Sequence, residues 1–121
     1  MKPLVNPADE PLIGKAFDEA VNMTVAEIEA WLDTAESRSV GTMRRGESES
    51  VGRQSARRIV AILRRPRDEL SDVDYAHMRK VVGFVRRHRA QRPARDVTKT
   101  RWRYSLMNWG HDPLKGLRPD I

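Results

Sequence analysis

Apolar residues recur along this chain at the three- and four-residue spacing of α-helices, and no segment alternates in the manner of a β-strand. The first such stripe predicts a helix that ends near Asn22, and its members are Leu12, Ile13, Ala16, Phe17, Ala20 and Val21. A second helix is predicted over residues 24–35, because Thr24 and Glu27 have the spacing of a capping box.

Three further helices are predicted over residues 50–65, 72–91 and 98–109. Pro66 ends the first of these, since proline has no N–H to donate, and Ser71 is a suitable N-cap for the second. Gly110 fits the C-terminal end of the last. The sequence therefore predicts an all-α fold, in which residues 1–121 form a single domain of about five helices.

The segments outside these helices are predicted from their composition. Residues 1–10 are expected to form an extended arm, and residues 112–121 an extended tail. Residues 36–50 are rich in Ser, Gly, Arg and Glu and are expected to form a long polar loop between the second and third helices. Because a loop of this length is unusual inside a compact domain, it is expected to be mobile or to bind a partner.

The composition excludes several classes of protein. The chain has no cysteine, which excludes disulfides, thiolate metal sites and cysteine nucleophiles. No apolar run approaches 18 residues, and residues 1–10 lack the apolar segment of a secretory signal. We therefore expect a cytoplasmic protein with no membrane span.

Charge is unevenly distributed along the chain. Residues 1–36 carry a net charge of −6 and residues 37–121 carry +12, and 18 of the 23 basic residues are arginine. Arginine has a planar, permanently charged guanidinium that suits phosphate groups. This pattern favours nucleic-acid binding, although genome base composition and a simple solvated surface would give the same charge.

Helical spacing concentrates the arginines on faces of the third and fourth helices, and we expect these faces to contact phosphates with low sequence specificity. The expected partner is nucleic acid, DNA in preference to RNA and double-stranded in preference to single-stranded, which would make the protein nucleoid-associated. The candidate nucleic-acid-binding residues are Arg44, Arg45, Arg53, Arg57, Arg58, Arg64, Arg79, Lys80, Arg86, Arg87, Arg101 and Arg103.

The alternative function is protein–protein interaction or self-association, in which the acidic N-terminal segment of one copy docks on the basic segment of another, giving a homo-oligomer. An enzyme is not expected, because the chain has no glycine-framed nucleophile and no phosphate loop. His77, His88 and His111 lack the spacing of a metal site, so no metal, cofactor or small-molecule substrate is predicted.

Four segments resemble a known family, and their likeness extends over about residues 17–115. They are Glu36–Gly41, Glu49–Ser55 with the following Arg58-Ile59-Val60, Tyr75–Gly83, and the ending Arg101-Trp102-Arg103-Tyr104-Ser105-Leu106-Met107-Asn108-Trp109-Gly110-His111-Asp112-Pro113-Leu114-Lys115. The sequence is similar to a family of small microbial proteins catalogued as a domain of unknown function and often provisionally labelled DNA-binding proteins. The resemblance implies DNA binding and assigns no site residues.

Overall fold

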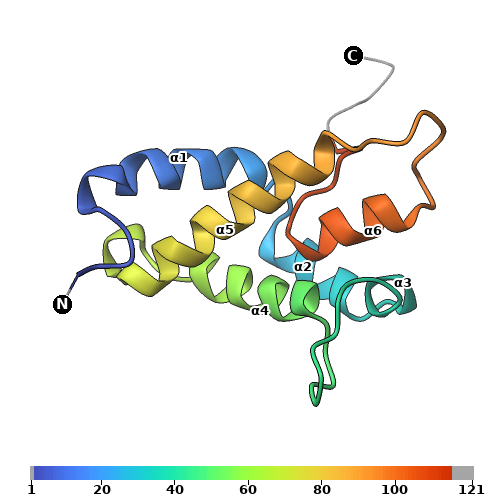
Figure 1. Ribbon diagram of the computed structural model, residues 1–121, viewed down its shortest axis with the longest axis horizontal. Helices are drawn as coiled ribbons and strands as arrows, with labels where there is room; N and C mark the ends of the chain where they lie inside the picture. The colour runs from blue at the N-terminus through green and yellow to red at the C-terminus, as the bar shows by residue number, and fades with distance from the viewer. Residues whose placement is uncertain (1, 116–121) are drawn as a thin grey trace.

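The computed structural model describes residues 2–115, and within that range the chain forms six α-helices and two short 3₁₀ turns (Figure 1). The helices are α1 (Glu10–Ala20), α2 (Val25–Leu32), α3 (Ala35–Arg38), α4 (Val51–Leu63), α5 (Asp72–Arg89) and α6 (Arg101–Asn108). Residues 2–115 contain no β-strand, so the prediction of an all-α fold is confirmed. No helix in this part of the chain is long and apolar enough to cross a membrane.

The helix boundaries follow local hydrogen bonds that the sequence already suggested. Thr24 Oγ1 accepts from the Glu27 N–H while the Glu27 carboxylate accepts from the Thr24 N–H, which completes the expected capping box of α2. Ser71 and Asp74 form a second capping box at the start of α5. Gly110 follows α6 with a φ of +79°, a left-handed conformation in which a Cβ would lie 3.1 Å from the Val21 side chain.

The predicted loop over residues 36–50 begins later in the structure. Thr34 Oγ1 accepts from the Ser37 N–H and caps the short helix α3, so the irregular segment starts at Ser39. Both ends of this segment, the 39–50 loop, are attached to the fold. Val40 is buried at one end, and at the other the Val51 N–H donates to the Thr42 carbonyl at 2.8 Å.

The predicted arm over residues 1–10 is also part of the packed fold. It contains the 3₁₀ turn Pro7–Asp9 and the first residue of α1, and Val5 is buried. The Val5 N–H donates to Asp72 Oδ1 at 2.8 Å, which attaches the arm to the start of α5. The extended tail predicted over residues 112–121 is wrong for its first part, because residues 113–115 form a turn in which the Lys115 N–H donates to the Asp112 carbonyl at 3.1 Å. Residues 116–121 lie outside the described residues.

The core lies between α5 and the helices around it. Helix α1 runs along α5, whereas α2 packs against α4 and α6, and α4 and α6 both contact α5. The fully buried side chains include Phe17, Ile28, Ile59, Met78 and Leu106, which come from five different helices. The expected stripe of α1 is buried at Ile13, Phe17, Ala20 and Val21, but Leu12 is 70% exposed because it lies at the edge of the helix–helix contact.

Candidate nucleic-acid interface

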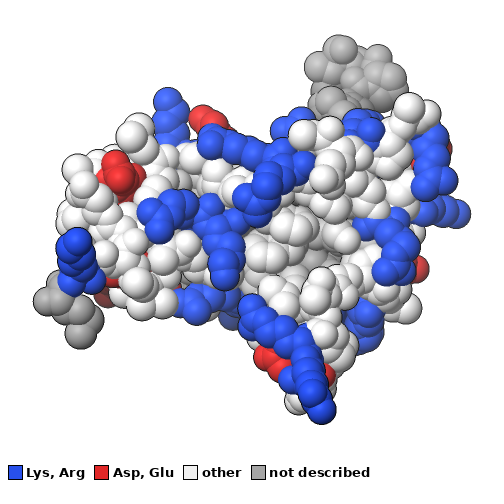
Figure 2. All heavy atoms as spheres, viewed as in Figure 1, with Lys and Arg blue, Asp and Glu red and all other residues white. Residues whose placement is uncertain are grey.

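Exposed cationic side chains lie along α5, and an exposed arginine of α4 lines the same pocket as Lys80. Arg79, Lys80, Arg86 and Arg87 are exposed on α5, and Arg58 is exposed on the adjacent face of α4. We refer to these five residues as the cationic strip. Figure 2 shows Lys and Arg side chains over α5, with others at the tip of the 39–50 loop and beside α6.

The charges of the cationic strip are not neutralised by the protein itself. Within residues 2–115, none of its five members has a carboxylate oxygen at ion-pair distance, and Arg79 donates only to the neutral Leu4 carbonyl at 3.3 Å. Arg45, in the 39–50 loop, is likewise exposed and has no carboxylate at ion-pair distance within that range. These six candidates are therefore available to an anionic partner.

Two of the predicted residues are exposed but already paired with acids. Arg57 makes a bidentate contact with the Glu49 carboxylate, the shorter bond being 2.8 Å, and this contact lowers the pKa of Glu49. Arg64 donates to Glu29 at 2.8 Å. Because each charge is offset locally, these arginines add little to the field of the cationic strip.

Arg53 lies inside the protein, with 6% of its surface exposed. Its Nη1 donates to the Leu32 carbonyl and to Ser37 Oγ, both at 2.8 Å, and its Nη2 pairs with Glu49 at 3.2 Å. This corrects the expectation that Arg53 contacts nucleic acid, because a buried guanidinium with bonded donors is inaccessible to phosphate. Spacing along α4 alone does not reveal that α2 lies against the start of that helix.

The Arg53 side chain belongs to a hydrogen-bond network that joins four helices. Ser37 Oγ donates to Asn108 Oδ1 at 2.6 Å, and the Asn108 amide returns a bond to the Ser37 carbonyl at 3.1 Å. The Trp31 indole N–H also donates to Asn108 Oδ1, at 2.8 Å. We call Trp31, Ser37, Arg53 and Asn108 the polar core network, since α2, α3, α4 and α6 contribute one member each.

The predicted residues of the last helix have different environments. Arg103 is only partly exposed and forms a bidentate pair with Asp112, both bonds being 3.1 Å, and it also donates to the Thr98 carbonyl. Arg103 therefore fixes the chain after α6, and its charge is offset locally by the Asp112 carboxylate. Arg101 is exposed and donates to the Ser39 carbonyl at 3.0 Å, so its charge stays available. Arg44 has a weak contact with Glu47 at 3.9 Å.

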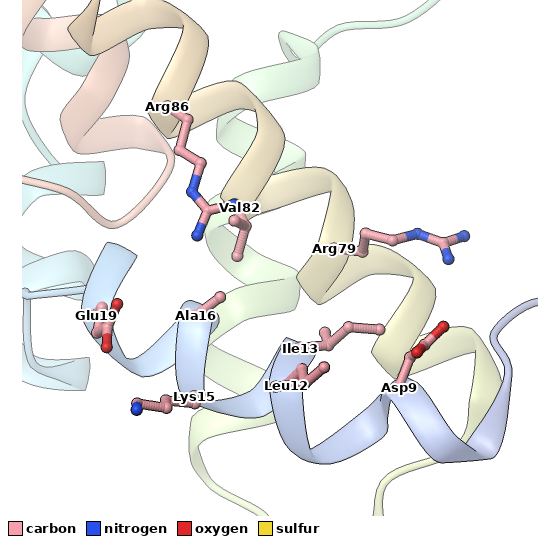
Figure 3. Close-up of a pocket in the computed structure, with 9 residues that line it drawn as sticks. All are labelled: Asp9, Leu12, Ile13, Lys15, Ala16, Glu19, Arg79, Val82 and Arg86. Carbon is pink, nitrogen blue, oxygen red and sulfur yellow. The ribbon is translucent and has the colours of Figure 1, made fainter.

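Arg79 and Arg86 also border a groove between α1 and α5, which has a volume of about 530 Å³. Figure 3 shows Arg86 reaching from α5 toward the groove and Arg79 pointing away from it. Glu19 and the exposed Leu12 lie on the α1 side. The acidic and basic segments of the chain therefore face each other across this groove.

Three further arginines extend the positive surface beyond the predicted set. Arg89, Arg92 and Arg95 are exposed at the end of α5 and in the segment that follows it, and within residues 2–115 none of them pairs with a carboxylate. The guanidinium of Arg92 lies over the Trp102 ring, 5.5 Å from its centroid. Arg92 and Arg95 lie in the basic, proline-containing stretch Gln91-Arg92-Pro93-Ala94-Arg95, a sequence signal that could have placed them in the set.

The three histidines have protein partners, as expected for structural histidines. His77 Nε2 lies 3.0 Å from Ser55 Oγ, His88 Nε2 lies 3.2 Å from the Trp102 carbonyl, and His111 Nδ1 lies 2.7 Å from the Ala20 carbonyl. Burial, together with the charges of Arg58 and Lys80, lowers the pKa of His77 to about 4. His77 is therefore neutral near pH 7.

Taken together, the fold and the site define a helical domain with an unneutralised cationic face. The chain belongs to the family described as "Protein of unknown function (DUF3140)", which matches residues 16–107. The expected resemblance to a family of unknown function is thereby confirmed, although the match includes only the first part of the Arg101–Lys115 segment. No curated protein and no solved structure matches the sequence.

Proposed function

We propose that this protein binds nucleic acid, double-stranded DNA in preference to RNA, through contacts between the cationic strip and backbone phosphates. The observation that carries the proposal is the exposure of Arg58, Arg79, Lys80, Arg86 and Arg87 without a carboxylate partner among residues 2–115. Elsewhere on the surface, Arg57, Arg64 and Arg67 are each paired with an acid. Phosphates would supply the missing counter-charge.

Binding through backbone phosphates depends little on the base sequence of the nucleic acid. Contacts to phosphate fix the position of a protein on the duplex, whereas sequence is read at base edges in the grooves. The cationic strip consists of long, flexible side chains on two helices, which suits contacts with phosphates. A protein of this type would act in the cytoplasm as part of the nucleoid, and the proposal includes no catalytic step.

Removal of two charges from the cationic strip tests this proposal against a matched control. The variant K80Q/R87Q is expected to weaken binding to a DNA duplex by at least about tenfold near 0.1 M salt, because two phosphate contacts are lost. The control R64Q/R67Q removes the same net charge from arginines already paired with Glu29 and Asp18. Fluorescence anisotropy should show a much smaller loss for this control.

The sequence of the duplex should not matter to either result. We expect the same ratio between variant and wild-type affinities for several unrelated duplexes, because only the backbone is contacted. Equal losses for K80Q/R87Q and R64Q/R67Q would contradict the proposal, since they would show that net charge rather than the cationic strip governs binding.

The alternative function, self-association, is favoured by the groove between α1 and α5. This groove combines the exposed Leu12 with Asp9 and Glu19 on one side and Arg79 and Arg86 on the other. A second copy related by a two-fold axis could place acids of each copy opposite arginines of the other. Light scattering at low and high salt distinguishes this arrangement, because screening would dissociate it.

A further inference from the structure

A cleft with two different ends opens beside the cationic strip. One end is an apolar chamber of about 330 Å³ between α4, α5 and α6, lined by Phe84, Trp109, Val51, Thr42 and Ser105 among others. The other end, of about 240 Å³, is polar and is lined by Arg44, Arg58, Lys80, Ser55 and His77. Val51 and Trp109 line both ends, so the two cavities are adjacent, and we refer to the pair as the Trp109 cleft. Figure 2 shows an uncharged hollow between α5 and α6 with blue side chains around it.

The apolar end is built from stacked rings. The Trp109 ring lies 4.4 Å from Phe84, and Phe84 lies 5.1 Å from His88, with interplanar angles of 15° and 14°. His77 continues the stack on the other side of Trp109, at 6.2 Å between centroids. Because both faces of the Trp109 ring are covered in this stack, the wall that it contributes is preorganised and presents ring edges, over which a planar ligand packs edge to face.

Polar groups at the apolar end lack partners within the protein. In residues 2–115, the indole N–H groups of Trp31 and Trp102 donate to Asn108 Oδ1 and to the His88 carbonyl, but that of Trp109 makes no hydrogen bond. The side chains of Thr42 and Ser105, two residues that line the same chamber, make no hydrogen bond in that range either. An aromatic wall with free donors and acceptors suits a planar heterocycle, whose faces are apolar and whose edges are polar.

The polar end carries positive charge without compensation. Arg58 and Lys80 belong to the cationic strip, and Arg44 has only its weak contact with Glu47. His77 is neutral near pH 7, so the charge at this end comes from the guanidinium groups and the ammonium group. Such a set of donors favours a phosphate.

We propose that the Trp109 cleft binds one nucleotide unit, with its base against Phe84 and Trp109 and its phosphate between Arg58 and Lys80. The inference rests on the proposed function and adds to it a site for an unpaired nucleotide next to the surface that contacts the backbone. The nucleotide belongs to a nucleic-acid strand or is free in solution, since both present the same chemistry.

A cleft-filling variant tests this site directly. S105L places a branched side chain in the apolar chamber and breaks no hydrogen bond of the Ser105 side chain within residues 2–115. We expect it to weaken binding of a short single strand by about tenfold, the scale of one lost base–aromatic contact. Binding of a fully paired duplex should change by less than about twofold, because only the backbone contacts of the cationic strip are used there.

A second pair of variants tests the polar end of the cleft even if S105L fails to fold. Lys80 lines the cleft, whereas Lys99 is exposed and does not, so K80Q and K99Q remove equal charge from different places. K80Q is expected to reduce single-strand affinity at least about threefold more than K99Q does. Equal effects of the two variants would overturn the inference.

Three probes separate the possible results for the wild-type protein: a short single strand, thymidine monophosphate and a fully paired duplex. Tryptophan fluorescence should be quenched by the single strand, and quenching by thymidine monophosphate as well would identify a free nucleotide as a second source. Salt-dependent binding of the duplex, without quenching by the single strand or by thymidine monophosphate, would overturn the cleft while leaving the proposed function intact. If the protein binds none of the three probes, both the cleft and the proposed function are overturned.

Discussion

Replacement of Arg53 by methionine is expected to lower the free energy of unfolding by about 3 kcal/mol. Methionine keeps much of the side-chain bulk but removes the donors to the Leu32 carbonyl and to Ser37 Oγ. These acceptors stay buried without their strongest partner, and the contact between α2 and α4 loses its main polar link. Urea unfolding followed by circular dichroism measures the change.

Arg57 provides the matched control for this variant. It lies one turn further along α4 and pairs with the same carboxylate, Glu49, but its side chain is largely exposed. R57M is expected to cost less than about 1 kcal/mol, because exposed ion pairs contribute little. Similar losses for R53M and R57M would contradict the assignment of Arg53 to the polar core network.

Phe17→Ala is expected to reduce stability by about 3 to 5 kcal/mol. Phe17 is fully buried where α1 runs along α5, and truncation leaves a cavity that the surrounding helices fill only partly. The neighbouring Leu12 belongs to the same sequence stripe but is exposed, so Leu12→Ala should cost less than about 0.5 kcal/mol. Comparable losses for the two variants in a denaturant titration would show that α1 is rotated relative to the structure.

The helices could be predicted from the sequence because their signals are local. Thr24, Ser71 and Gly110 act through hydrogen bonds or backbone angles within a few residues of themselves, and the structure confirms all three. Helix α3 was missed because its single capping residue, Thr34, precedes only four helical residues, too few for an apolar period. Leu12 was assigned to the core because spacing gives the face of a helix but not the edge of its contact.

The candidate interface could be predicted only in part, for a related reason. Periodicity identified the arginines that share a helix face, and the structure leaves Arg58, Arg79, Lys80, Arg86 and Arg87 exposed. It could not identify which arginines are used inside the protein, because the partners of Arg53 and Arg103 include groups from other elements. The charge of an arginine is a property of the sequence, but its availability depends on tertiary contacts.

The Trp109 cleft could not be predicted from the sequence. Ser55 and His77 are 22 residues apart, and Val51, Phe84 and Trp109 come from three different helices or their ends. The helical spacing of Trp102, Leu106 and Trp109 fits the buried face that they form in and just after α6. It gave no indication that the Trp109 indole N–H would lie beside a cavity.

The acidic segment of the chain is a packing partner of the basic one. Glu27 pairs with Lys115, Glu29 with Arg64 and Asp18 with Arg67. Three acids of residues 1–36 therefore pair with cations from the basic segment of the same molecule. The Lys115 contact and the capping bonds from Thr24 lower the pKa of Glu27 to about 2. These pairs neutralise part of the basic segment, whereas within residues 2–115 the cationic strip and further arginines such as Arg45 and Arg89 have no carboxylate partner.

The salt dependence of DNA binding tests the central claim most directly. A titration of a labelled duplex at several salt concentrations gives the slope of log K against log salt, which is about −0.9 for each phosphate neutralised. If at least four of the five residues of the cationic strip contact phosphates, the slope should be steeper than about −3. A slope near zero, or no binding at low salt, would contradict the account.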